Sequence, residues 1–219
     1  MKLKTLQAVL ISACFVWTGT AVSADKPVGI TPDMKDATVQ HGGKSVTIMR
    51  DQNNKATVNP AFAKTSRPCP PFCIQPIVLA PGVETLGERE IIDYIVRMSN
   101  GDDSIMVIDS RTPDWVQKGT IPGAVNIPWT ALNPAKGADP ISIGEIMEDQ
   151  FNAKSLEGLW DYTDAKTLVM FCNGMWCGQS PNNIKNLLKF GYPSHKLKWY
   201  RGGMQNWSNL GLTTVKPSS

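Results

Sequence analysis

The stretch "VMFCNGMWCGQSP", residues 169–181, contains two cysteines five positions apart, Cys172 and Cys177. The apolar run before Cys172 is typical of a buried strand, and Ser180 followed by a proline is typical of a helix start. A short loop from a strand to a helix N-terminus turns backbone N–H groups inward and favours negative charge. We therefore expect Cys172 to have a lowered pKa and to react as a thiolate.

Thiolates are both nucleophiles and metal ligands, so this loop alone leaves several kinds of site open. Besides Cys14, the chain has four cysteines: Cys69, Cys73, Cys172 and Cys177. An even number permits disulfides in an exported protein, and the simplest pairing joins the two close pairs. The spacings C-x3-C and C-x4-C do not match the tight C-x2-C zinc knuckle, so no metal site is predicted.

The N-terminus is typical of a cleavable secretory signal. A basic "MKLK" start is followed by an apolar stretch and by "AVSA", which predicts a signal peptide over residues 1–24 and a periplasmic protein. Because "ISAC" also resembles a lipoprotein box, a membrane association is expected only if Cys14 is lipidated. Without Lys2 and Lys4, the 22 basic side chains fall to 20 against 19 acidic ones, so the charge predicts no nucleic-acid partner.

The mature chain divides into two regions of different composition. Residues 25–84 are polar and proline-rich, with a hairpin predicted around Gly42 and Gly43. We interpret this region as an N-terminal extension laid over the main domain at residues 85–216. Because both cysteine pairs lie in loops, "RPCPPFCIQP" (residues 67–76) is expected to pack near the face that carries Cys172.

Strand and helix patterns alternate in the main domain. Apolar runs predict strands at residues 104–109, 123–128, 167–171 and 196–200. Capping boxes at "TLGE" (residues 85–88) and "SIGE" (residues 142–145) predict helix starts, and a third helix is predicted to begin at Ser180 and Pro181. This alternation indicates an α/β fold with a mostly parallel sheet, in which ligands bind beyond the carboxyl ends of the strands.

Two further stretches carry a family resemblance. "VIDSRTPDWVQKGTIPGAVNIPW" (residues 107–129) and "WYRGGMQNWSNLGL" (residues 199–212) are similar to the opening and closing signatures of rhodanese-like sulfurtransferases, and Cys172 falls in the catalytic position between them. The resemblance implies a parallel five-stranded sheet with helices on both faces. It also implies that Cys172 takes a sulfane sulfur from a small anion as a persulfide and passes it to a thiol acceptor, with no cofactor.

The resemblance also assigns roles to residues around Cys172. Asp109 is expected to cap backbone N–H groups, and Arg111 to make a buried ion pair or bond carbonyl groups. The predicted loop and substrate-binding residues are Asn173, Gly174, Met175, Trp176, Gly178, Gln179 and Ser180.

The loop departs from the family pattern in its length and charge. Ser180 follows Cys172 by eight positions, two more than usual, and no arginine or lysine lies between them. The missing cation argues against phosphatase activity. Cys177 stands where the cation is expected, and Lys185 could supply a charge only from the helix.

These departures leave three hypotheses for the function. In the first, the protein is a periplasmic sulfurtransferase that uses Cys172 and transfers sulfur to a small or protein thiol. In the second, Cys172 and Cys177 form a thiol redox or soft-metal site, with Cys177 as resolving or disulfide partner. In the third, the fold is a catalytically silent binding module.

Overall fold

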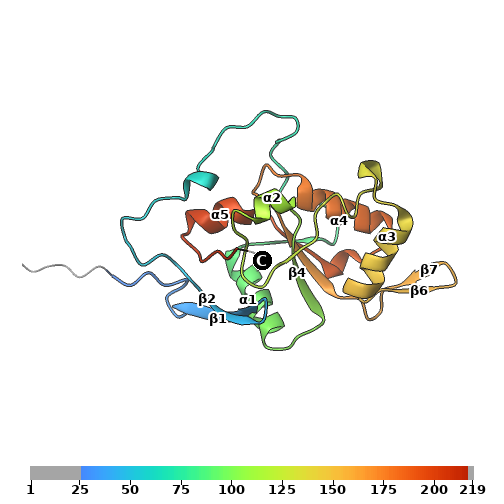
Figure 1. Cartoon of the computed structure of the whole chain (residues 1–219), viewed down its shortest axis with the longest axis horizontal. Coiled ribbons are helices and arrows are strands. Elements are labelled where there is room, and N and C mark those ends of the chain that lie inside the picture. Colours follow the sequence, from blue (N-terminus) through green and yellow to red (C-terminus); the bar gives the residue numbers. More distant parts are fainter. Residues whose placement is uncertain (1–25, 217–219) are drawn as a thin grey trace, which may run out of the picture.

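A parallel β-sheet with helices on both faces forms the centre of the molecule (Figure 1). The computed structural model describes residues 26–216, so the predicted signal peptide (residues 1–24) and Cys14 lie outside the described residues. Five strands pair in the order β3-β9-β8-β4-β5, and every pairing in this sheet is parallel. The predicted α/β fold with a five-stranded parallel sheet is therefore confirmed.

The elements follow the chain in a regular alternation. The strands of the central sheet are β3 (Glu84–Leu86), β4 (Ile105–Asp109), β5 (Val125–Asn126), β8 (Thr167–Phe171) and β9 (Leu197–Tyr200). The α-helices are α1 (Glu88–Ser99), α2 (Pro113–Val116), α3 (Pro140–Glu145), α4 (Gln179–Lys189) and α5 (Gly203–Asn209). Two-stranded antiparallel hairpins are formed by β1 (Asp36–His41) with β2 (Lys44–Met49), and by β6 (Lys154–Leu156) with β7 (Leu159–Asp161). Short helical turns are η1 (Pro60–Phe62), η2 (Pro134–Lys136), the π-helical η3 (Ile146–Gln150) and η4 (Ser194–Lys196).

Successive residues of the central strands point into two separate cores. Val107 of β4 and Val169 of β8 join a cluster that includes the apolar sides of α1 and α5. Their neighbours Ile108 and Met170 join a second cluster with α3, η3 and α4. Because side chains alternate along a strand, continuous apolar runs such as "TLVMF" supply both faces at once. The sheet is thus buried on both sides, which holds the carboxyl ends of β4 and β8 in fixed positions.

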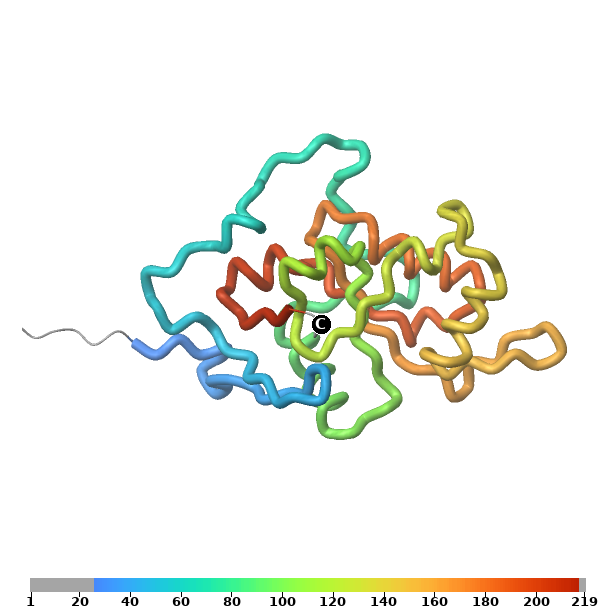
Figure 2. The backbone as a smooth tube through the Cα atoms, in the orientation of Figure 1, coloured from blue at the N-terminus to red at the C-terminus, as the bar shows by residue number. Residues whose placement is uncertain are grey.

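The N-terminal extension contains the predicted hairpin, β1-β2, and wraps around the domain. Val39 of β1, Ile48 of β2 and Phe62 of η1 are buried in the same cluster as α1 and α5. From η1 the chain runs as an open loop along the upper edge in the view of Figure 2 before it enters β3 (Figure 2). The extension therefore contributes core residues to the domain rather than lying apart from it.

Three helices begin at other residues than the sequence patterns predict. The capping box predicted at "TLGE" is wrong, because Thr85 lies in β3. The actual box lies two residues later, where the Glu90 carboxylate accepts a hydrogen bond from the Gly87 N–H at 3.1 Å. The "SIGE" box is also wrong, because Asp139 caps α3 and accepts from the N–H of Ile141 and of Ser142. Helix α4 begins one residue before Ser180, at Gln179, and its N-cap is Gly178. Within residues 26–216, no helix has the length and apolar character needed to cross a membrane.

Candidate active site

Cys172 lies at the carboxyl end of β8, beyond the centre of the parallel sheet. Its side chain is only 2% exposed. The Ser180 hydroxyl, on the first turn of α4, donates a hydrogen bond to the Cys172 sulfur at 3.2 Å. The indole N–H of Trp199 in β9 in turn donates to the Ser180 oxygen at 3.2 Å. Three neighbouring elements, β8, α4 and β9, thus fix the position of this sulfur.

The surroundings of Cys172 stabilise its thiolate. Burial alone would raise the pKa of this thiol, because a charge loses solvation in the protein interior. The Cys177 thiol, the Ser180 hydroxyl and the backbone N–H groups of Ser180 and Gly174 all donate toward the sulfur, and together they lower the pKa of Cys172 to about 7. Near neutral pH, the thiol and thiolate forms of Cys172 are therefore both populated.

Cys177 is the second buried thiol of the loop formed by residues 172–180, here called the cysteine loop. Burial raises the pKa of Cys177 well above its usual value, and its hydrogen bond to Cys172 and the charge there raise it further. Cys177 thus stays protonated while it donates to the Cys172 thiolate. The predicted disulfide between these cysteines is not present: both are free thiols, and the Cys172 sulfur faces the Ser180 hydroxyl and, at 3.5 Å, the carbonyl oxygen of Cys177.

The start of α5 holds the first half of the cysteine loop in place. The Met204 N–H donates to the Cys172 carbonyl at 3.0 Å, and the Gln205 N–H donates to the Asn173 carbonyl at 2.9 Å. This close approach needs a glycine at position 203, because a Cβ there would overlap the Cys172 carbonyl oxygen. Gly203 also has a φ of +55°, a conformation that side chains disfavour. The glycine pair of the closing signature therefore shapes the cysteine loop.

A buried ion pair supports the neighbouring loop after β4. The Arg111 guanidinium donates to the Asp109 carboxylate at 2.6 Å, with both side chains at most 1% exposed. Arg111 also donates to the carbonyl oxygens of Gly119 and Trp115, at 2.7 and 3.3 Å. Asp109 accepts from the Arg111 backbone N–H and, at 2.7 Å, from the hydroxyl of Thr120. These bonds tie residues 109–120 into one unit beside the site.

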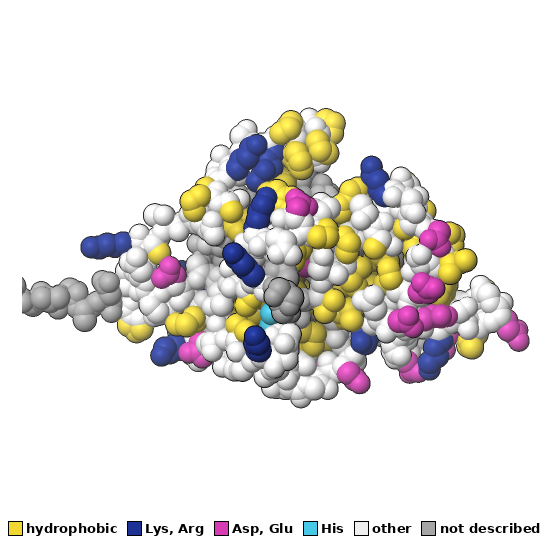
Figure 3. Space-filling model, in the orientation of Figure 1, with side chains coloured by type: hydrophobic (Ala, Val, Ile, Leu, Met, Phe, Trp, Pro, Cys, Tyr) yellow, Lys and Arg dark blue, Asp and Glu magenta, His cyan; other side chains and the backbone are white. Residues whose placement is uncertain are grey.

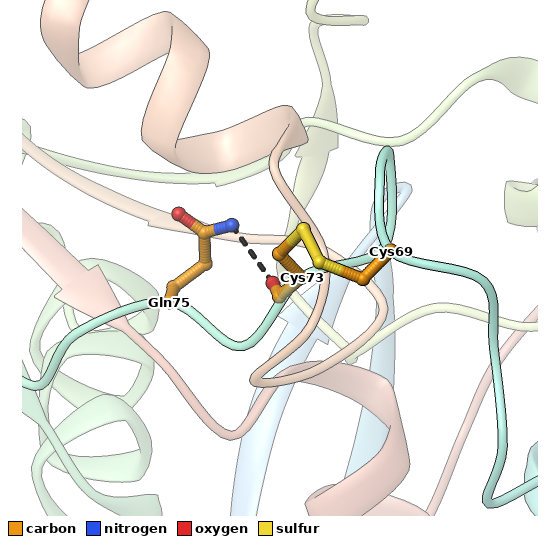
Figure 4. The surroundings of a disulfide bond; sticks show 3 residues. All are labelled: Cys69, Cys73 and Gln75. Carbon is orange, nitrogen blue, oxygen red and sulfur yellow. Dashed lines mark hydrogen bonds between the residues drawn. A yellow bond between two sulfur atoms is a disulfide. The ribbon is translucent and has the colours of Figure 1, made fainter.

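A segment of the N-terminal extension, residues 67–75, lies against the cysteine loop and is called the cover segment here. Cys69 and Cys73 are joined by a disulfide within it, and Gln75 donates its side-chain amide to the Cys73 carbonyl at 3.0 Å (Figure 4). The Gln75 backbone N–H donates to the Met175 carbonyl at 2.8 Å, and Arg201 donates to the Gln75 carbonyl, also at 2.8 Å. The prediction that this proline-rich segment packs near the Cys172 face is confirmed.

Trp176 is the main contact between the cover segment and the cysteine loop. The Arg67 guanidinium lies over its ring, 3.7 Å from the centroid, and Phe72 meets it edge-on at 5.6 Å. On the other side, the Trp176 indole donates to the Gln205 amide oxygen at 2.6 Å. Arg67 places a cation beside a loop that has none of its own, whereas Lys185 is exposed to solvent on α4.

Arg67 is a residue of the candidate site that the sequence analysis did not identify. Burial lowers the pKa of its guanidinium. Its position in a proline-rich stretch carries no signal of a functional role. The charge that the loop lacks is supplied by a residue more than a hundred positions earlier in the chain.

A pocket of about 320 Å³ opens between the cover segment and the cysteine loop. It is lined by Arg67, Pro71, Phe72, Trp115, Trp129, Asn173, Trp176, Cys177, Gly178, Gln179 and Asn182. The structure thus brings five of the predicted site residues to its wall. Ser180 and Gly174 instead contact Cys172, which is not among the lining residues, and Met175 is 37% exposed. In the described part of the chain, no group of three or more His, Cys, Asp or Glu side chains is arranged to hold a metal ion.

Comparisons with solved structures found chains of similar fold. A protein from Bacillus halodurans is 18% identical, with a TM-score of 0.38, and the match covers 57% of this chain and 70% of that one. A protein of unknown function from Rhodopseudomonas palustris, described as a possible tyrosine phosphatase, is 19% identical with a TM-score of 0.39, covering 61% and 85%. The human single-domain sulfurtransferase TSTD1 is 21% identical with a TM-score of 0.35, covering 57% and 95%.

The family assignment comes from the sequence itself. No curated protein matches the chain. The family described as Rhodanese-like domain matches residues 92–210, more than half of the 219-residue chain. This region holds the Asp109–Arg111 signature, the cysteine loop and most of the closing signature. The chain therefore belongs to the rhodanese-like domain family.

Proposed function

We propose that this protein is a sulfurtransferase that carries sulfane sulfur as a persulfide on Cys172. The observation that carries the proposal is the set of donors around one sulfur atom: the Ser180 hydroxyl, the Cys177 thiol and the N–H groups of Gly174 and Ser180. These donors stabilise a thiolate before the reaction. They can stabilise the terminal negative charge of a persulfide after it.

The first half-reaction transfers one sulfur atom to the enzyme. The Cys172 thiolate attacks the outer sulfur of thiosulfate, the bond between the two thiosulfate sulfurs breaks, and sulfite leaves with the bonding electron pair. The products are the Cys172 persulfide anion and sulfite, so charge and atoms balance. Because Cys172 is 2% exposed, the cysteine loop has to open for the donor to reach the sulfur.

The second half-reaction returns Cys172 to its thiolate form. The thiolate of an acceptor attacks the outer persulfide sulfur, takes it as a new persulfide, and releases Cys172. A small thiol or a cysteine of a periplasmic protein fits this role. Periplasmic location is part of the proposal: the N-terminal signal pattern supports it, and so does the Cys69–Cys73 disulfide, since disulfides persist mainly in oxidising compartments.

The test is a sulfur-transfer assay with thiosulfate as donor and a small dithiol as acceptor. Wild-type protein is expected to release sulfide from the acceptor, whereas Cys172→Ser is expected to fall to the uncatalysed background. Ser155→Ala is the control, because this exposed serine of β6 lies outside both the cysteine loop and the cover segment. Transfer that persists in Cys172→Ser would overturn the proposal.

A second candidate function is thiol–disulfide exchange, and the pairing of two free buried thiols favours it. A Cys172 thiolate that accepts a hydrogen bond from the Cys177 thiol is arranged to attack a disulfide of a partner. Cys177 would then attack the mixed disulfide at Cys172, release the partner as a dithiol and leave a Cys172–Cys177 disulfide. The two functions separate in Cys177→Ser, which should keep single-turnover sulfur loading but lose disulfide exchange.

A further inference from the structure

The pocket beside the cysteine loop has an aromatic wall. Phe72 comes from the cover segment, Trp115 from α2, Trp129 from the loop after β5 and Trp176 from the cysteine loop. Each comes from a different part of the chain, and the pocket exists only because the cover segment closes one side. Its volume of about 320 Å³ falls within the range of small-molecule sites. An apolar or aromatic group is the natural occupant of such a wall.

Three of the residues that line this pocket each have a buried polar side-chain atom with no hydrogen-bond partner among the described residues. These atoms are Nε of Arg67, Nε1 of Trp129 and Oδ1 of Asn173. Two of them are N–H donors, and a buried donor without an acceptor costs about 1 to 3 kcal/mol. Since buried polar groups in proteins are nearly always satisfied, an acceptor bound in the pocket would complete the hydrogen bonding of these two donors.

Positive charge surrounds the same wall. The Arg67 guanidinium lies 3.7 Å from the centre of the Trp176 ring, Lys118 Nζ lies 4.0 Å from that of Trp115, and Lys136 Nζ lies 5.6 Å from that of Trp129. None of the described residues that line the pocket is acidic. On the face seen in Figure 3, Lys and Arg side chains lie beside hydrophobic ones over the loop that is teal in Figure 1 (Figure 3).

Arg67 takes part in none of the ion pairs formed within residues 26–216. A guanidinium stacked on an indole keeps its in-plane N–H groups available, and it matches the oxygens of a sulfonate or carboxylate. No carboxylate among the described residues therefore neutralises the charge of Arg67, which lies beside the pocket and over the Trp176 ring.

We propose that this pocket binds an organic anion, whose head accepts hydrogen bonds from Arg67 and Trp129 and whose apolar body lies against Phe72 and Trp176. The proposal deepens the sulfurtransferase function and rests on it for the identity of the substrate: the sulfur donor is an organic thiosulfonate. The Cys172 thiolate attacks its outer sulfur, the sulfur–sulfur bond breaks, and the organic sulfinate leaves with the electron pair. Inorganic thiosulfate has no apolar body and gains nothing from the aromatic wall.

The binding site is tested with benzenesulfonate, which has the apolar body and the anionic head but no transferable sulfur. Quenching of tryptophan fluorescence, checked by calorimetry, gives its affinity for the full mature chain. Arg67→Gln is expected to weaken binding at least tenfold. Lys64→Gln, which removes the same charge from an exposed position three residues away, is expected to stay within twofold of wild type. Methanesulfonate, which keeps only the head, is expected to bind at least tenfold more weakly.

Equal affinity in wild type and Arg67→Gln, or no saturable binding to wild type, would overturn the proposal. If Arg67→Gln loses its fold by circular dichroism, Trp129→Phe replaces it, because this variant keeps an aromatic ring at the wall and removes the N–H donor. A tenfold loss there supports the site, and an unchanged affinity overturns it.

The substrate assignment is tested separately from the binding site. The kcat/KM for benzenethiosulfonate is expected to exceed that for thiosulfate at least tenfold, and Arg67→Gln is expected to remove most of this preference. A preference for thiosulfate would overturn the substrate assignment. If benzenesulfonate binds through Arg67 while neither donor loads sulfur onto Cys172, the proposed function fails and the organic-anion site stands.

Discussion

The Ser180 hydroxyl lies 3.2 Å from the Cys172 sulfur and donates a hydrogen bond to it. Ser180 is fully buried, and the indole of Trp199 donates to its oxygen, which leaves the hydroxyl hydrogen free for Cys172. The cysteine loop is two residues longer than the usual family loop, and it still brings the first turn of α4 into contact with the Cys172 sulfur. The unusual loop therefore keeps a thiolate-stabilising donor although it lacks a cation.

Ser180→Ala should raise the pKa of Cys172 by about one to two units, because a hydrogen bond to a charged group contributes about 1.5 to 3 kcal/mol. The pH dependence of Cys172 alkylation, followed by mass spectrometry, gives the midpoint directly. Ser155→Ala, an exposed serine in β6, is the control and should leave the midpoint unchanged. An identical midpoint in wild type and Ser180→Ala would show that this hydroxyl does not stabilise the thiolate.

The rate of sulfur loading should increase with pH and level off above neutrality. A pKa of about 7 means that the reactive thiolate of Cys172 is populated only as pH rises through that value. The single-turnover rate should therefore be about tenfold higher at pH 8 than at pH 6. Cys177→Ser keeps a hydroxyl donor and should shift this profile little. A rate that falls as pH rises would contradict a thiolate nucleophile.

Gly203→Ala should destabilise the protein and disorder the cysteine loop. A Cβ at this position would overlap the Cys172 carbonyl oxygen and lie 2.8 Å from the Gly174 nitrogen, and the positive φ adds backbone strain. We expect a loss of about 1 to 3 kcal/mol in the free energy of unfolding, measured with urea, together with faster alkylation of Cys172. Gly144→Ala in α3, where a Cβ meets only ordinary contacts, should match wild type or be slightly more stable.

Asp109→Asn should lower the free energy of unfolding by about 3 to 5 kcal/mol, because it leaves the buried Arg111 charge uncompensated. Urea denaturation measures the change. Lys154→Gln removes the exposed ion pair with Asp164 and should have a much smaller effect. Similar losses of unfolding free energy in the two variants would contradict the expectation that burial makes the Asp109–Arg111 pair more important for stability than an exposed pair.

Much of the fold could be predicted from local patterns. The strand that ends just before Cys172, the strand that ends at Asp109 and the hairpin at Gly42 and Gly43 all follow from continuous or alternating apolar runs between turn residues. The helix starts were less accurate, because "TLGE" and "SIGE" satisfy the capping pattern while Glu90 and Asp139 provide the actual contacts. Which residue caps a helix depends on the path of the preceding segment, and a local pattern does not contain that path. Strand β3 has only three residues, which is too few for a recognisable strand pattern.

The candidate site is likewise predictable from the sequence only in part. Cys172, Cys177 and Ser180 could be placed because they are neighbours in sequence and follow a buried strand. Arg67 could not be identified, because its role depends on how the proline-rich cover segment folds back over Trp176. The contact is between residues more than a hundred positions apart, and no local pattern encodes it.

The most direct test of the central claim is the intact mass of the mature protein before and after incubation with thiosulfate and, separately, benzenethiosulfonate. Wild type and Cys177→Ser should each gain the mass of one sulfur atom from at least one donor, lost again on treatment with a reducing thiol, and Cys172→Ser should gain none. No gain on wild type from either donor, or an equal gain on Cys172→Ser, would contradict a persulfide carried by Cys172.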